Sequence, residues 1–162
     1  MIKGTSPEVF YHTRGRNKIL DGDYHGGISD LNKVVEQYPN YPKISFLYTT
    51  RGYAKAKLGD RQGSISDSTQ AIIRNPKYAD SHRNRGIQKF KLNDYTGTIS
   101  DMNQVIKLQP NNKFAYMYLG DAKYKSGDIE GACSDWQKAS QLGNKLTIKW
   151  LSEKGKSICA SN

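Results

Sequence analysis

The chain has 162 residues, of which 36% are hydrophobic and 25% charged, and its formal net charge is +10. This length suits one ordinary domain, and the composition argues against a disordered chain. No apolar run approaches the roughly 18 residues that cross a bilayer, and the start lacks an apolar signal core. We therefore expect a soluble, cytoplasmic protein without a membrane span, whose positive charge favours acidic partners.

One nine-residue string recurs four times along the chain. It reads GDYHGGISD, GDRQGSISD, NDYTGTISD and GDIEGACSD, at residues 22–30, 59–67, 93–101 and 127–135. Each copy begins seven residues after a glycine, and these glycines are Gly15, Gly52, Gly86 and Gly120. Their separations are 37, 34 and 34 residues. A period of about 34 residues predicts an array of helix pairs, because each pair must stack on its neighbours to bury an apolar face.

Each unit is predicted to contain two helices joined by a Gly-Asp or Asn-Asp pair. Glycine or asparagine tolerates the left-handed conformation past a helix end, and aspartate caps the next helix. We expect helices near 7–20, 24–37, 43–58, 61–73, 79–92, 95–108, 113–126 and 129–141. A last helix over 145–156 carries Leu146, Trp150 and Leu151, which we expect to cover the open end of the stack.

Further positions recur at fixed offsets from the four glycines. A small residue follows by twelve (Gly27, Ser64, Thr98, Ala132), a larger one by sixteen (Leu31, Met102, Trp136, with Ser68 departing), and a proline by twenty-four (Pro39, Pro76, Pro110). Over residues 8–144 this pattern resembles the tetratricopeptide repeat (TPR) family, and the last unit resembles the final repeat of small bacterial members.

The resemblance implies an all-α fold, a right-handed α-solenoid of four TPR-like helix pairs with a C-terminal capping helix. We expect one domain spanning residues 1–162. Its repeats would lie at about 8–41, 45–78, 79–112 and 113–144, and its capping helix at about 145–157. Members of the family bind peptides or other proteins in a concave groove.

The family also implies which residues face that groove, because these positions keep fixed offsets from the first-helix glycine. Carried over, the predicted partner-binding residues are Phe46, Thr49, Tyr53, Lys57, Arg83, Ile87, Phe90, Lys91, Phe114, Met117, Tyr124 and Lys125. The same rule places Asp121 there. Aromatic and cationic groups together suit an acidic or apolar-acidic peptide. The alternative is a solvated lysine face without a partner.

An arginine directly precedes three of the glycines. Arg14, Arg51 and Arg85 stand there, and an aspartate follows each glycine by fifteen residues. We interpret these as structural ion pairs, because a half-buried guanidinium needs a carboxylate partner. The alternative is an anion-binding site. The spacing leaves open whether the aspartate belongs to the same repeat or to the preceding one.

Two further residue types raise structural questions. Gly26, Gly63, Gly97 and Gly131 sit early in the second helices, where glycine costs about 0.5–1 kcal/mol relative to alanine, so we expect a close approach of the neighbouring helix there. Cys133 occupies a position that is isoleucine in the other repeats, and we interpret it as a small core residue. With Cys159 it defines neither a disulfide framework nor a metal-ligand spacing.

The sequence offers no catalytic constellation. His12, His25 and His82 have no partner at metal-ligand spacing, and no nucleophile or phosphate-loop motif occurs. We therefore predict a non-catalytic protein-interaction scaffold without cofactor or metal. The alternatives are a basic helical module that binds nucleic acid, or a self-associating assembly factor that forms a homo-oligomer.

A carboxylate clamp, the device of chaperone-binding members of the family, is not expected. Its first places hold His12 and Arg16, the next holds Thr50, and the last hold Asp80 and Asn84. Shifting the comparison by one repeat gives no better match. We therefore do not expect the chain to bind the tail of a chaperone.

Overall fold

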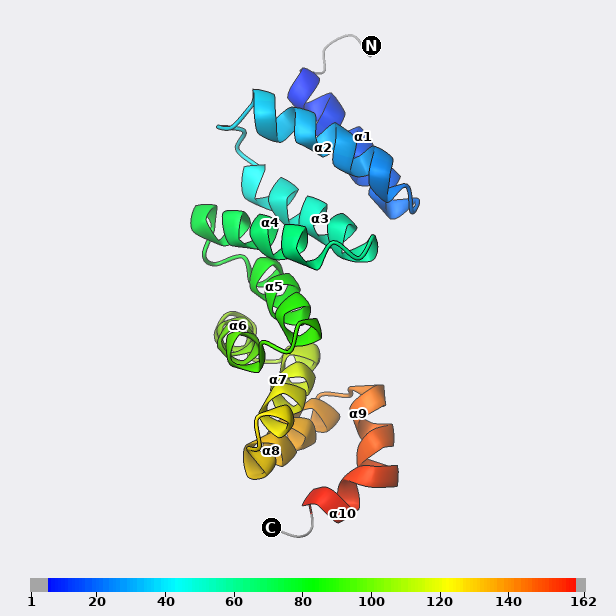
Figure 1. Cartoon of the computed structure of the whole chain (residues 1–162), viewed down its shortest axis with the longest axis vertical. Helices are drawn as coiled ribbons and strands as arrows, with labels where there is room; N and C mark the ends of the chain where they lie inside the picture. The colour runs from blue at the N-terminus through cyan, green and yellow to red at the C-terminus, as the bar shows by residue number, and fades with distance from the viewer. Residues whose placement is uncertain (1–5, 160–162) are drawn as a thin grey trace. The chain divides into compact units, whose positions relative to one another are not determined.

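The computed structural model describes residues 6–159, and all of their regular structure is helical. The chain divides into two compact units, the first ending at Asn84 and the second beginning at Arg85. The first unit contains α1 (Pro7–Leu20), α2 (Tyr24–Gln37), α3 (Ile44–Lys57) and α4 (Arg61–Arg74), as Figure 1 shows. The boundary between the units falls within α5 (Ala79–Lys91).

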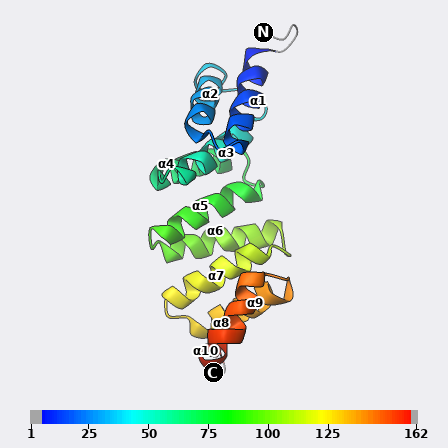
Figure 2. The same cartoon turned by 90° about the vertical axis from the view of Figure 1, so that its right-hand side faces the viewer.

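The second unit continues the pattern with α6 (Tyr95–Leu108), α7 (Lys113–Lys125) and α8 (Ile129–Gln141). Three short elements follow: α9 (Lys145–Trp150), the π-helical turn η1 (Leu151–Gly155) and α10 (Lys156–Cys159). Figure 2 shows α9 lying beside α7 and α8, the helix pair that it accompanies. The eight repeat helices match their predicted bounds to within one residue. The described residues contain no helix that is long and apolar enough to cross a membrane.

The recurring string is the turn between paired helices together with the first turn of the second helix. Its first residue has a positive φ in every copy: Gly22, Gly59, Asn93 and Gly127. The aspartate that follows is the N-cap, and its carboxylate accepts a hydrogen bond of 2.8–2.9 Å from the backbone N–H three residues on. The turn predicted from the Gly-Asp pair is therefore confirmed.

The same cap explains the early glycines. The N–H that each capping aspartate receives belongs to Gly26, Gly63, Gly97 or Gly131, and a Cβ added at these positions would run into that carboxylate. Our expectation of a close neighbouring helix was wrong for Gly26, Gly63 and Gly131, whose nearest atoms all belong to the capping aspartate. At Gly97 the side chain of Lys89 on α5 would also lie 2.8 Å from an added Cβ. Close helix approach occurs instead at the first-helix glycines; an added Cβ on Gly15 would lie 3.0 Å from the carbonyl oxygen of Gly27.

Each unit has its own apolar core at the interfaces of its helices. In the first unit it includes Leu31, Val34 and Leu47, all fully buried. In the second, Met102, Val105 and Leu119 join α6 to α7, and Ala132, Cys133 and Trp136 form a cluster on α8. Leu31, Met102, Ala132 and Trp136 are residues that recur at twelve or sixteen after the glycines, so the repeat period positions part of this packing.

The repeated arginine and aspartate form ion pairs within one repeat. Arg14 Nη2, Arg51 Nη2 and Arg85 Nη2 each lie 2.6 Å from an oxygen of Asp30, Asp67 and Asp101 respectively. The lysine four residues after each arginine reaches the second oxygen at 3.0–3.2 Å. Two cations therefore bind each buried carboxylate. The structural interpretation is confirmed, and the question of which repeat supplies the aspartate is answered.

The fourth repeat lacks this arginine because Leu119 takes its place. Among residues 6–159, Asp135 has a single ion-pair partner, the repeat lysine Lys123, at 2.8 Å. Burial raises the pKa of Asp135, against the lowering effect of Lys123. In the first repeat the hydrogen bond from Arg14 instead lowers the pKa of Asp30. In the first repeat, the hydrogen bond from Arg14 is thus the largest influence on the pKa of Asp30.

The C-terminal segment differs from its prediction in two ways. The expected helix over 145–156 is interrupted by η1, and a disulfide joins Cys133 of α8 to Cys159 of α10, with 5.6 Å between their Cα atoms. Cys133 is buried as expected, but our view that the cysteines define no disulfide was wrong. Spacing alone gave no signal, because 26 residues separate the pair and the fold brings them together.

Of the three residues predicted to cover the end of the stack, two pack against α8 and one does not. Trp150 packs on Trp136, with 4.3 Å between the ring centroids, and Leu151 also contacts the α8 cluster. Leu146 is 69% exposed, so the expectation that it covers the stack was wrong. The indole of Trp150 and the disulfide hold this end of the second unit.

Candidate functional site

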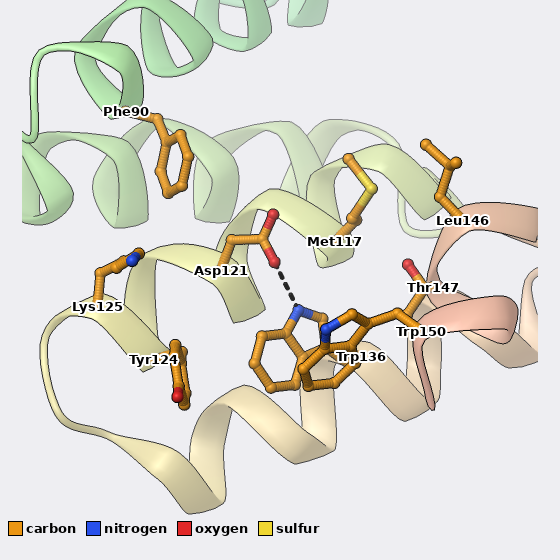
Figure 3. A pocket seen from close by; sticks show the side chains of 9 residues that line it. All are labelled: Phe90, Met117, Asp121, Tyr124, Lys125, Trp136, Leu146, Thr147 and Trp150. Carbon is orange, nitrogen blue, oxygen red and sulfur yellow. Dashed lines mark hydrogen bonds between the residues drawn. The ribbon is translucent and has the colours of Figure 1, made fainter. Parts of the chain in front are cut away.

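The second unit contains a hollow of about 420 Å³, which we call the tryptophan pocket (Figure 3). Its lining comes from the end of α5 and from α7, α8 and α9. The lining residues are Phe90, Met117, Asp121, Tyr124, Lys125, Trp136, Leu146, Thr147 and Trp150. Most of this lining is aromatic or aliphatic, and a mostly apolar concave surface with few polar groups is typical of a ligand site.

Helical spacing brings one wall of the tryptophan pocket together. On α7, Asp121 and Lys125 follow Met117 by four and eight residues, so these side chains share one face. Gly120 lies next to them, and a Cβ added there would be 2.7 Å from the indole of Trp136. Glycine at this position therefore leaves room for the indole, which is the pocket floor and is only 4% exposed.

The carboxylate of Asp121 is the main polar group of the tryptophan pocket. Its Oδ1 accepts a hydrogen bond of 2.8 Å from Trp136 Nε1, drawn as the dashed line in Figure 3. Burial raises the pKa of Asp121, while the Trp136 hydrogen bond and the charge of Lys125 act in the opposite direction. On the α9 side, Thr147 Oγ1 is buried and has no hydrogen-bond partner among residues 6–159.

The first unit has a second, smaller hollow of about 220 Å³, the first-unit hollow. It is lined by Arg16, Ile19, Leu20, Phe46, Thr49, Thr50, Tyr53, Tyr78, Asp80, Arg83 and Asn84. Arg83 is paired with Asp80 at 2.9 Å, and the hydroxyls of Thr49 and Ser81 share a hydrogen bond of 2.7 Å. Several of its polar groups are thus already satisfied, so it offers a ligand less than the tryptophan pocket does.

No protein-family model matches the sequence, and no curated protein matches it either. Solved structures do match. The crystal structure of YrrB, described as a TPR protein with an unusual peptide-binding site, is 14% identical, with a TM-score of 0.79 over 90% of this chain and 74% of that chain. This chain has the tetratricopeptide repeat fold.

Two further TPR-like structures extend the comparison. MamA from Desulfovibrio magneticus RS-1 is 18% identical, with a TM-score of 0.81 over 97% of this chain and 91% of that chain. The first TPR of Spaghetti, bound to the HSP90 peptide SRMEEVD, is 20% identical, with a TM-score of 0.67 over 73% of this chain and 95% of that chain. At these identities the likeness establishes the fold alone.

The TPR positions predicted to face the groove are distributed between the two hollows. Phe46, Thr49, Tyr53 and Arg83 line the first-unit hollow, and Phe90, Met117, Tyr124 and Lys125 line the tryptophan pocket. The other four lie outside both: Lys57 above the ring of Tyr53, Ile87 against the α6–α7 core, and Lys91 and Phe114 at exposed positions.

Sequence reasoning missed the residues of the tryptophan pocket that lie outside the first helices. Trp136 appeared as a core residue of the TPR pattern, and Trp150 and Leu146 as parts of a cap. Thr147 gave no signal. The available clue was that both tryptophans of the chain fall in the last unit and its cap, where an end-covering segment can add a wall to the groove.

The lysines that recur three and five residues after the repeat glycines fall into two classes. Lys18, Lys55, Lys89 and Lys123 pair with the buried repeat aspartates. Lys57, Lys91 and Lys125, two residues after the last three of these, are exposed and have no ion-pair partner within the described chain. The second class is therefore available to an external anion.

Proposed function

We propose that this TPR protein is a non-catalytic interaction scaffold that binds a peptide segment of a partner protein, with the tryptophan pocket as the principal contact. The observation that carries the proposal is the pocket itself. It combines aromatic walls with one carboxylate and one unpartnered hydroxyl, a combination suited to a side chain with an apolar body. Buried aromatic surface is also where most interface energy is concentrated.

The exposed lysines support an acidic character in the flanking residues of that peptide. Lys125 stands at the pocket, while Lys57 and Lys91 occupy the corresponding positions of earlier repeats. Their charges are unpaired within the described residues, so an acidic segment gains attraction without displacing an internal partner. The peptide in the Spaghetti structure, SRMEEVD, has acidic residues, and it provides a precedent on the same fold.

Nucleic acid is the less favoured partner. The four repeat aspartates engage seven of the recurring cations: Arg14, Arg51, Arg85, Lys18, Lys55, Lys89 and Lys123. These cations are committed to internal pairs, which leaves fewer free charges for phosphates than the net charge of +10 suggests. Of the exposed repeat lysines, Lys125 lies at the tryptophan pocket and Lys57 lies above the ring of Tyr53, a residue of the first-unit hollow.

The disulfide is evidence about the cellular compartment of the protein. Disulfides persist in oxidising compartments and are rare in the cytosol. The Cys133–Cys159 pair therefore favours an oxidising compartment over the cytoplasm expected from the sequence. Alkylation of free thiols in lysates quenched with acid measures the redox state of the pair in the source cell. Full alkylation of both cysteines would show that they are reduced in the cell and would favour the cytoplasm instead.

Peptide display against the full chain tests the proposed function. Selected peptides should bind the wild-type protein, should not be displaced by excess RNA or duplex DNA, and should fail to bind when Lys57, Lys91 and Lys125 are all replaced by glutamate. The matched control replaces Lys77, Lys107 and Lys138, which are also exposed, by glutamate. Equal loss in both triple variants would show a general charge effect, and failure to select any peptide would refute the scaffold proposal.

A further inference from the structure

The carboxylate of Asp121 lies among aromatic rings. Trp136 and Trp150 have centroids 4.3 Å apart, and the ring of Tyr124 lies 5.5 Å from that of Trp136. Phe90 adds a ring from α5, and Figure 3 shows the carboxylate in the middle of this set. Aromatic faces are negative and attract cations, so rings and carboxylate present the same sign of charge to the pocket interior.

Asp121 has an oxygen available for an occupant. Its Oδ1 accepts from Trp136 Nε1, while Oδ2 has no hydrogen-bond partner among the described residues and is not sealed from solvent. A carboxylate in apolar surroundings is unfavourable unless a cation compensates for its lost hydration. The raised pKa of Asp121 reflects this cost.

Asp121 differs in this respect from the repeat aspartates. Asp30, Asp67, Asp101 and Asp135 each have at least one cation within 3.2 Å. Asp121 has none within 4.0 Å in the described chain, although Lys125 also lines the pocket. Lys125 is exposed at the edge, so it stands where a charge on the flank of a ligand would meet it. The position inside the pocket that a counter-ion of Asp121 would take is therefore open.

We propose that the tryptophan pocket accepts a basic side chain, arginine or lysine, from the partner peptide. This proposal rests on the proposed function and specifies the residue that anchors the peptide. The cationic head donates to Asp121 Oδ2, and the aliphatic stem lies between the rings of Trp150 and Tyr124. The charge of the head is stabilised by the carboxylate and by the aromatic faces together. Acidic neighbours of the anchor meet Lys125, so the recognised segment is a basic residue with acidic flanks.

The charge of the anchor distinguishes this proposal from a purely apolar anchor. A leucine or norleucine side chain would fill the same volume but would leave Asp121 desolvated and without a cation. An acidic side chain would place two carboxylates in one hollow. Arginine and citrulline have the same shape and differ in charge, so they form the decisive pair of probes.

The test uses a peptide selected by display on the full chain, with its anchor located by substitution at each position. The anchor is then changed from arginine or lysine to citrulline or norleucine, and affinities are measured by calorimetry. We expect each neutral anchor to bind at least about tenfold more weakly. The Asp121→Asn variant keeps an amide oxygen for Trp136 Nε1, and it should lose most of the preference for a charged anchor, keeping only the part that the aromatic faces contribute. Glu130→Gln removes one exposed carboxylate elsewhere in the second unit and should leave the preference unchanged.

The outcomes separate the two proposals. If no peptide is selected, the scaffold function fails and this inference fails with it. If peptides bind but the anchor is neutral or acidic, or if Asp121→Asn keeps the full preference for charge, the scaffold stands and the basic anchor is refuted. Thermal unfolding of Asp121→Asn checks its fold. Lys125→Gln gives a second arm: it should weaken binding of a peptide with acidic flanks while leaving the preference for a charged anchor unchanged.

Discussion

Replacing Arg51 by leucine tests how the ion pairs hold the repeats together. Arg51 donates from Nε and Nη2 to the two oxygens of Asp67 at 2.8 and 2.6 Å, and its Nη1 donates to Asn32 at 2.8 Å. Its side chain is only 11% exposed and that of Asp67 3%, so solvent screens the pair little. The fourth repeat already contains the equivalent change, since Leu119 stands there beside Asp135.

The magnitude follows from what remains after the substitution. Stranding a buried charge without any partner costs about 3–5 kcal/mol. Lys55 stays 3.0 Å from Asp67, so the carboxylate keeps one cation. Hydrogen bonds to charged groups contribute about 1.5–3 kcal/mol, and this is the interaction that the variant loses. We therefore expect Arg51→Leu to lower the free energy of unfolding by about 2 kcal/mol.

Urea unfolding of a double-mutant cycle is the appropriate assay. The cycle comprises Arg51→Leu, Asp67→Asn and the double variant, and a coupling of more than about 1 kcal/mol is expected for charged groups in contact. Arg16→Leu is the matched control, because Arg16 is exposed and has no ion-pair partner in the described chain; its cost should stay within about 0.5 kcal/mol. A coupling near zero, or equal costs for both arginines, would refute the structural role of the repeated pairs.

Three further predictions concern the second unit. Gly120→Ala should lower stability by about 1–3 kcal/mol, because its Cβ would overpack against the Trp136 indole, and Gly52→Ala, whose nearest contacts are 3.2 Å, should cost less in the same melts. Cys159→Ser should lower the free energy of unfolding by about 2–4 kcal/mol in urea under oxidising conditions, whereas variant and wild type should be equally stable in reductant. Equal stability under oxidising conditions would contradict a native disulfide. Acidification should weaken binding of a basic anchor, because Asp121 takes up a proton and loses its charge. Burial raises the pKa of Asp121 above its ordinary 3.8, so calorimetry should show the loss of affinity beginning at a higher pH than for an ordinary aspartate. An affinity that does not change with pH would contradict the ion pair.

The repeat scaffold could be predicted from the sequence because its signals are local. The Gly-Asp turn sets a left-handed residue and an N-cap within two positions, so helix ends at Gly22 or Gly127 followed from residue type alone. The Arg–Asp pairing also followed, since a recurring offset places charged groups on facing helices. Whether each arginine pairs with the aspartate of its own repeat or of the preceding repeat could not be predicted. The offset of 15 residues from the glycine does not say which of the two neighbouring helices the aspartate faces.

The candidate pocket could be predicted only in part. Tyr124 and Lys125 came from the groove pattern, but the other wall comes from α9. The segment that follows α9 breaks at η1 and is linked through Cys159 to Cys133. Neither feature has a short-range signal in the sequence. Trp136 was assigned correctly to the core, yet its indole also forms the pocket floor, a double role that only the packing around Gly120 discloses.

Tryptophan spectroscopy tests the central claim most directly, because both tryptophans of the chain line the proposed binding pocket. A display-selected peptide is titrated into the full chain while the indole Nε1–H signals of Trp136 and Trp150 are followed by NMR. We predict that both signals shift and saturate at the affinity that calorimetry gives, and that Trp150→Ala abolishes binding. A peptide that binds in calorimetry while both indole signals stay unperturbed would place the site elsewhere and contradict the account.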